Sequence, residues 1–233
     1  NCSAVIGGNL TATNQAKIAV NGTGSINVYN NSTIACSSCT PTPTQKSGPL
    51  PTIPTVSIPT GLAVVTDATC ATRTCQPGIY NSQLVLNKNA SYTFASGFYV
   101  FNKGLLMNSA IVNSAPNGVT LYVAANQPID LSGTVTLTAL SSTGCTPGSG
   151  VAIYQEPSTI TSMSLAGSTN QLNVNGIINL PYSDITISGT SSNFSLQGSI
   201  VAHSLSLNGN MNPSVSANPC NNFVSHNKVS LLQ

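Results

Sequence analysis

The stretches Gly97-Phe-Tyr-Val-Phe101 and Gly118-Val-Thr-Leu-Tyr-Val123 show the pattern on which this sequence is built, a glycine followed by a short apolar run. The pattern occurs six times between Gly78 and Ala202. Its copies begin at Gly78, Gly97, Gly118, Gly150, Gly176 and Gly198. Self-similarity at a period of about 20–50 residues is the sequence signature of stacked-repeat proteins. We therefore expect each copy to form one level of a stack.

Short alternating runs lie between the copies, for example Tyr92-Thr-Phe94, Val135-Thr-Leu137 and Phe194-Ser-Leu196. Alternation of apolar and polar residues predicts strands with one face in the core and the other in solvent. Runs this short bury a core only by stacking on one another. The sequence therefore predicts an all-β fold, a right-handed parallel β-helix (β-solenoid) with about 20–25 residues per coil. A β-sandwich also shows many short strands with turn signals, but the returning glycine favours the solenoid.

Composition divides the chain into four expected segments. We predict N-terminal solenoid coils at 1–39, a proline-rich extended segment at 40–61, the main solenoid at 62–211 and a C-terminal cap at 212–233. Proline fixes φ and lacks an N–H donor, so the second segment is not a central strand. Its prolines are Pro41, Pro43, Pro49, Pro51, Pro54 and Pro59. Apolar residues such as Val56 and Ile58 between them favour a segment laid along the solenoid over a free linker.

Charge is scarce in this sequence. Only 4% of the 233 residues are charged and the net charge is +2, whereas about 25% charged residues is usual in a soluble domain. The small net charge gives no indication of binding to nucleic acid or to an anionic membrane. No run of apolar residues is long enough for a transmembrane helix. A polar but nearly uncharged surface is compatible with self-association and with a secreted or cell-surface location.

Seven cysteines indicate disulfides and an oxidising compartment. Cys70 and Cys75 are close enough in sequence for a disulfide that closes a turn. A disulfide between Cys145 and Cys220 would link the late coils to the tail. Cys2, Cys36 and Cys39 remain, so the pairing stays open and one thiol is left over. Cys36-Ser-Ser-Cys39 also has the spacing of a zinc or redox motif. No second C-x-x-C or nearby histidine completes such a site, so we favour a structural role.

Several of these runs resemble the secreted C-terminal part of TadG-type proteins of bacterial tight-adherence (Flp) pilus assembly. The resemblance rests on Cys75-Gln-Pro-Gly-Ile-Tyr80, Tyr92-Thr-Phe-Ala-Ser-Gly-Phe-Tyr-Val-Phe101, Gly118–Val123, Gly150-Val-Ala-Ile-Tyr-Gln155 and Leu172–Pro181. It covers most of the chain, and its most specific piece is Pro-Gly-Ile-Tyr. It implies an envelope-associated or secreted protein without enzymatic activity, linked to surface adhesion and to pilus or envelope components.

Residues for catalysis are few. The four acids, Asp67, Asp130, Asp184 and Glu156, lie in different repeats, whereas polysaccharide-cleaving β-helices need several carboxylates on one face. We therefore interpret each acid as structural. His203 lies on an expected strand and His226 in the tail, without metal-ligand spacing. No G-x-S-x-G elbow is present. We assign no catalytic residue, cofactor or metal.

The favoured hypothesis is an extracellular structural or adhesion protein of the bacterial surface, able to self-assemble into filaments or to associate with pili. The alternatives are a polysaccharide-binding or polysaccharide-cleaving β-helix protein and an ice-binding protein. Threonine ranks would favour ice, but the pattern Thr134-Val-Thr136-Leu-Thr138 does not recur at each coil. The aromatic residues Tyr80, Tyr99, Tyr122 and Tyr154 fall in the repeats, where a core ladder is favoured over a ligand surface.

Overall fold

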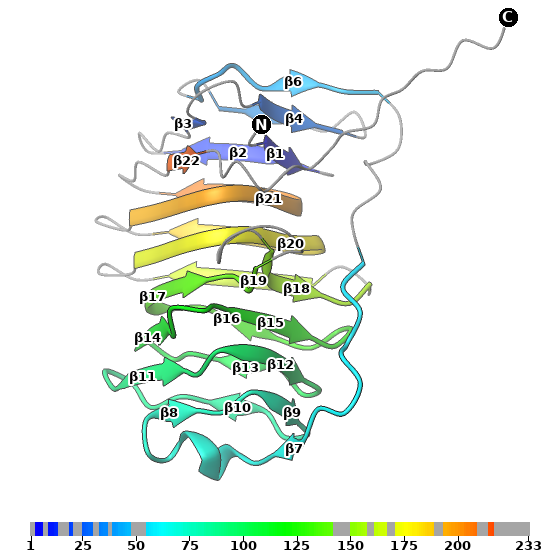
Figure 1. The fold of residues 1–233 in the computed structure, drawn as a ribbon. Coiled ribbons are helices and arrows are strands. Elements are labelled where there is room, and N and C mark those ends of the chain that lie inside the picture. The colour runs from blue at the N-terminus through cyan, green and yellow to red at the C-terminus, as the bar shows by residue number, and fades with distance from the viewer. Residues whose placement is uncertain are drawn as a thin grey trace, which may run out of the picture.

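A computed structural model describes residues 3–6, 9–13, 19–20, 25–29, 33–36, 39–47, 55–141, 150–157, 161–166, 171–188, 193–208 and 214–216. It shows a parallel β-solenoid of about seven turns, as predicted (Figure 1). Every strand pairing among the described residues is parallel, which distinguishes this fold from the two-layered antiparallel sandwich. The one helical element described is η1 (Asp67–Cys70), a single 3₁₀ turn.

Each of the early coils has three short sides, which we number in chain order. The first side holds β8 (Thr74–Cys75), β11 (Ser91–Phe94), β14 (Ala110–Ser114) and β17 (Gly133–Thr138). The second side holds β7 (Val64–Val65), β9 (Gly78–Tyr80), β12 (Gly97–Phe101), β15 (Val119–Val123) and β18 (Val151–Gln155). The third side holds β10 (Leu84–Val85), β13 (Leu105–Leu106), β16 (Ile129–Asp130) and β19 (Thr161–Ala166).

Two long strands complete the main solenoid. β20 (Gln171–Ser188) and β21 (Asn193–Asn208) each run over all three sides of the coil, so each forms a turn by itself. They pair in register over most of their length, from Gln171↔Asn193 to Ser188↔Asn208. The register shifts between Leu180 and Asp184, at the corner between the second and third sides.

The N-terminal strands stack on the last coil of the main solenoid. β1 (Ser3–Ile6) and β2 (Leu10–Thr13) pair with β21, and β4 (Ser25–Val28) and β5 (Ile34–Ala35) pair with β1 and β2. β22 (Ser214–Ser216) lies between β21 and β3 (Ala19–Val20), while β6 (Thr44–Gln45) pairs with β4. N-terminal strands thus lie beyond the last coil, where we expected a C-terminal cap. Of residues 212–233, only β22 lies within the described part.

One hydrophobic core runs through all of these coils. Ile6, Leu10 and Ile26 from the N-terminal strands are fully buried in the same cluster as Leu205 and Leu207 of β21. The side chains that point into the core are mainly aliphatic. Aromatic residues gather at the β7 end of the core, at Tyr80, Phe94, Tyr99 and Phe101. The junction between the first and last parts of the chain is therefore packed like the inside of the main solenoid.

Gly118 shows why glycines recur at the corners. Its φ is +87°, which L side chains rarely adopt. A Cβ at this position would lie 2.1 Å from the backbone oxygen of Ala139 in the next coil. Stacked coils approach so closely here that only a residue without a side chain fits.

The proline-rich segment is described at 40–47, where β6 pairs with β4 alone, and again from Thr55 onward. Residues 55–62, which we call the strap, run alongside the second side of the coil before the chain enters β7 (cyan in Figure 1). Val56 and Leu62 pack against an outward-facing cluster of Phe98, Val100 and Tyr122. The strap therefore covers apolar side chains that the coil directs away from its own core.

Candidate functional site

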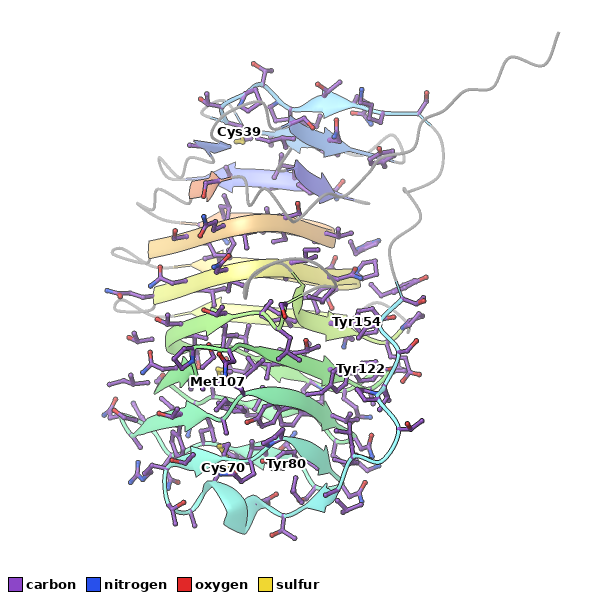
Figure 2. All side chains as sticks on the ribbon, in the orientation of Figure 1. Cys39, Cys70, Tyr80, Met107, Tyr122 and Tyr154 are labelled. Atoms are coloured by element: carbon purple, nitrogen blue, oxygen red, sulfur yellow. A yellow bond between two sulfur atoms is a disulfide. The ribbon has the colours of Figure 1, made fainter. Side chains whose placement is uncertain are left out.

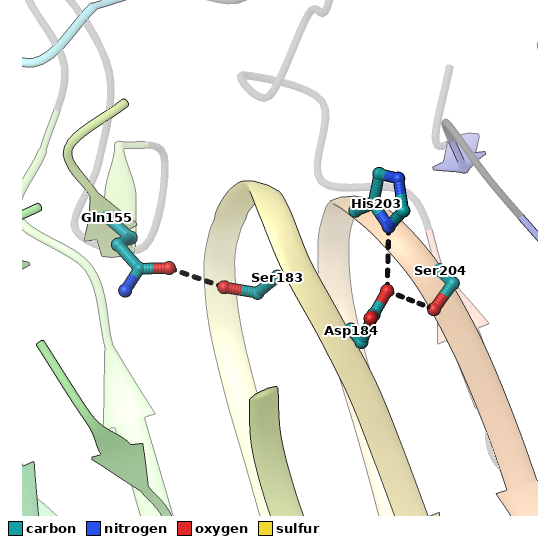
Figure 3. Close-up of polar contacts among 5 residues, drawn as sticks. All are labelled: Gln155, Ser183, Asp184, His203 and Ser204. Carbon is teal, nitrogen blue, oxygen red and sulfur yellow. Dashed lines mark hydrogen bonds and ion pairs between the residues drawn. The ribbon is translucent and has the colours of Figure 1, made fainter. Parts of the chain in front are cut away.

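A polar cluster occupies the corner between the second and third sides at β20 and β21 (Figure 3). His203 Nδ1 lies 2.7 Å from Asp184 Oδ1, and the Ser204 hydroxyl donates a hydrogen bond to the same carboxylate oxygen. One coil away, the Ser183 hydroxyl donates to the side-chain oxygen of Gln155, and both of these residues are about 1% exposed. The side chains of His203 and Asp184 are 35% and 45% exposed, so this pair is accessible to solvent.

Electrostatics at this corner favour the ionised form of Asp184. Partial burial works to raise the pKa of the carboxyl, but hydrogen bonds from His203 and Ser204 and the charge of His203 outweigh it. The net effect is a pKa below the usual range. The carboxylate is therefore held negative as a partner for its two neighbours.

These three side chains do not form a Ser–His–Asp relay. In such a relay the serine hydroxyl is bonded to the imidazole, which takes its proton during attack. Here Ser204 donates to Asp184 instead, and His203 Nδ1 donates to the same carboxylate oxygen. The geometry pairs side chains across two coils, and the partner of the Ser204 hydroxyl is a carboxylate and not the imidazole.

A second cluster lies on the outer surface of the second side, under the strap. The rings of Phe98, Tyr122 and Tyr154 stack from coil to coil, with centroids 6.1 Å and 5.1 Å apart. Figure 2 shows Tyr122 and Tyr154 beside the strap. The strap is bonded to this ladder through a backbone hydrogen bond between Val56 and Tyr154.

Burial and a neighbouring carboxylate perturb Tyr122. Its pKa is raised to about 12 by burial and then by the charge of Glu156, the nearby Tyr154 and a hydrogen bond to Glu156. Glu156 also accepts a hydrogen bond from the backbone N–H of Ala125 at 3.2 Å. The hydroxyl of Tyr122 is therefore held as a neutral donor to Glu156.

The tyrosines of the repeats divide between two environments. Tyr80 and Tyr99 are fully buried in the core, and their hydroxyls donate to backbone oxygens, as in the bond from Tyr99 to Ala95 at 2.7 Å. Tyr122 and Tyr154 point outward beneath the strap. The predicted core ladder thus holds for the first pair only, because the register places the second pair on alternate, outward positions.

A third feature is an unbroken column of neutral polar residues along the first side of the coil. Successive strands place in register Thr74, Thr93, Asn113, Thr136, Asn173, Ser195 and Ser214. A second column, two residues further along each strand, holds Thr138, Asn175, Gln197 and Ser216. The strands β17, β20 and β21 therefore each carry two outward hydroxyl or amide side chains on this side.

The two columns enclose a shallow groove of about 240 Å³ across β17, β20 and β21. Its polar walls are Thr136, Asn173 and Ser195 on one side and Thr138, Asn175 and Gln197 on the other. The remaining lining residues are Leu137 and Val174, whose side chains are buried in the core. All eight of these described lining residues are uncharged.

The predicted disulfide residues are partly described. Cys70 pairs with Cys75, as predicted, and closes the turn after η1. Cys36 pairs with Cys39, so this C-x-x-C is a disulfide in the structure. Cys2, Cys145 and Cys220 lie outside the described residues, as does His226.

The four acids are each bonded within their own neighbourhood. Asp67 accepts from Ser82 at 2.7 Å, and Asp130 accepts from the backbone of Ser132 at 2.8 Å. Asp130 and Asp184 lie on the same side of the coil but two coils apart, because Asp130 pairs with β19 and β19 pairs with β20. Among the described residues, no three or more His, Cys, Asp or Glu side chains group as metal ligands would.

The polar columns are the feature that sequence reasoning missed. A search for threonine at fixed spacing fails, because Asn and Ser occupy equivalent positions and the chain length between successive members varies. The sequence does carry a sign of these columns: the outward residue of each alternating run, such as Thr93, Thr136 or Ser195, is polar and uncharged.

Comparison with known proteins returned nothing: no family model, no curated protein and no solved structure matches this chain. The resemblance to TadG-type proteins therefore stays a prediction. Within the described part of the chain, no helix has the length and apolar character needed to cross a membrane.

Proposed function

We propose that this chain is an extracellular structural and adhesion protein of the bacterial cell surface, which presents the long sides of its solenoid to a neighbouring surface. The observation that carries the proposal is the single core that runs through every described coil, from β7 to the N-terminal strands on β21. Close-packed interiors resist deformation, so such a stack behaves as a stiff body.

Three further features support this role. The outer side chains of the polar columns are neutral, so contact with another surface meets little electrostatic repulsion. The strap and two disulfides hold segments that would otherwise be sites for proteolysis. The TadG-type resemblance of the repeats supports an envelope location and association with Flp-type pili.

Self-association is part of the proposal. The β7 end of the solenoid carries Val64 and Val85, whose side chains are 66% and 51% exposed. β7 and β10 each pair with one strand only, so their outer edges are free to accept another strand among the described elements. A filament would form by addition at such an end.

Labelling of intact source cells with an antibody against the folded chain tests the location. We expect labelling without permeabilisation and reduced attachment of a deletion strain, restored by the wild-type gene. Labelling only after permeabilisation, or unchanged attachment of the deletion strain, would contradict the proposal. Electron microscopy of native material tests assembly, and monodisperse monomers at high concentration would rule out the filament.

A further inference from the structure

The groove between the two polar columns of the first side has the features of a binding site for an extended ligand. It crosses three consecutive strands, β17, β20 and β21, which are stacked directly on one another (Figure 1). Neighbouring strands are about 4.8 Å apart, and alternate residues on one strand are about 6.6 Å apart. The groove walls therefore form a lattice of polar groups that repeats along the solenoid axis.

The walls combine hydroxyl and amide side chains at every level. Thr136 faces Thr138, Asn173 faces Asn175 and Ser195 faces Gln197 across the groove. Hydroxyls and primary amides each supply both donors and acceptors. Sugar hydroxyls are also both donors and acceptors, and a neutral glycan chain presents them at regular intervals along its length.

We infer that this groove binds a neutral polysaccharide lying along the solenoid axis. The inference deepens the proposed adhesion role and rests on it for its biological meaning, since it names the chemical class of the surface that is bound. Acidic polysaccharides fit less well, because none of the described residues that line the groove is cationic. The amides and the hollow shape also differ from the flat threonine ranks that ice binding requires.

Binding should depend on the length of the glycan. Each level contributes exposed hydrogen bonds that compete with water, so a single sugar unit gains little net affinity. A polymer contacts several levels at once, and its later contacts form at high effective concentration. The first polar column also continues below the groove through Asn113, Thr93 and Thr74, which extends the track toward the β7 end.

Affinity electrophoresis with soluble polysaccharides tests the inference. The purified full chain would be run through native gels containing dextran, galactomannan or mixed-linkage β-glucan, with alginate as an acidic comparison. We expect retardation by at least one of the neutral polymers, little change with added salt, and no retardation by the matching monosaccharides. The double variant Asn173→Ala/Gln197→Ala should reduce the retardation at least about tenfold, because two amides are lost from adjacent levels.

Thr186→Ala/Ser206→Ala is the matched control, because these residues point outward from the same two strands on the third side of the coil. Circular dichroism melts would verify that both double variants fold. Absence of retardation of the wild-type chain by every neutral polymer would overturn the inference, as would equal retardation of the groove variant. Thermal hysteresis without retardation would assign the columns to ice instead.

The same variants separate this inference from the proposed function. If the groove variant loses polysaccharide binding in the gel but cells carrying it attach normally, the groove is a glycan site that adhesion does not need. If cells require the protein for attachment while the wild-type chain binds no neutral polymer, the adhesion role stands and the inference fails.

Discussion

At the residue scale, the structure distinguishes side chains that hold the stack together from side chains that face outward. Gly118 and Asp184 show two ways in which single residues fix neighbouring coils. The first permits close backbone contact with Ala139, and the second bridges β20 to His203 on β21. Recurrence of glycine could be read from the sequence, whereas the Asp184–His203 pair could not, because it depends on the register shift at that corner.

Substitution of Gly118 by alanine should destabilise the fold strongly. The new Cβ would meet the Ala139 oxygen at 2.1 Å in addition to the positive φ. We expect a loss of at least about 2 kcal/mol in the free energy of unfolding, from backbone strain and steric contact together. Gly61→Ala is the control, since Gly61 also has a positive φ but no atom within 4 Å of the new Cβ. Equal urea midpoints for the two variants would contradict the steric explanation.

The pair between Asp184 and His203 predicts a loss of stability in acid. Because the folded state lowers the pKa of Asp184 below its ordinary value of 3.8, its contribution to stability is present above that value. It is lost as the pH falls through the folded-state pKa. His203→Ala should raise the pKa of Asp184, measured by NMR of the carboxyl carbon, and should flatten the decrease in melting temperature below about pH 4. At neutral pH the half-exposed pair should contribute less than about 1 kcal/mol. An unchanged Asp184 pKa in the variant would show that His203 does not cause the shift.

At the element scale, the strap and the short strands depend on each other. Apolar residues between the prolines predicted a segment lying on the solenoid, and the described part places Val56 and Leu62 on the outward aromatic ladder. The target of the strap was not predictable from sequence. Alternation alone does not reveal that Tyr122 and Tyr154 face outward while Tyr80 and Tyr99 face inward, because tyrosine suits either environment.

Truncation of Val56 should loosen the strap. Val56→Ala removes two methyl groups from a half-buried contact with the ladder, which we expect to cost about 1 kcal/mol of local stability. Limited proteolysis should then cleave the strap several times faster than in the wild type. Ile58→Ala is a matched control, because the side chain of Ile58 is 43% exposed. Similar cleavage rates for the two variants would show that the Val56 contact does not hold the strap in place.

At the scale of the whole molecule, the order of the coils differs from the order of the sequence. The N-terminal strands follow β21 in space, and the chain then returns along the second side to begin the main solenoid at β7 (Figure 1). Stacking was predictable from the repeats, but this order was not. Each coil presents similar apolar and polar positions on both of its edges, so the sequence does not specify which coil lies next to which.

The packing of the N-terminal strands on β21 should contribute to the stability of the entire stack. Leu10 is fully buried opposite Leu205, so Leu10→Ala should lower the free energy of unfolding by about 2–5 kcal/mol. Thr11→Ala, one residue later and on the outer surface, should change it by less than about 0.5 kcal/mol. Thermal denaturation with light scattering measures both effects. A variant of Leu10 that melts like the wild type would indicate that the N-terminal coils unfold independently.

The pairing of β2 with β21 also has a consequence for biosynthesis. β1 and β2 pair with β4 and β5 nearby in the chain, but their other partner, β21, is synthesised only after the whole of the main solenoid between them in sequence. Docking of the N-terminal strands on β21 is therefore expected to be a late step in folding, after the coils from β7 to β20 can pair with one another.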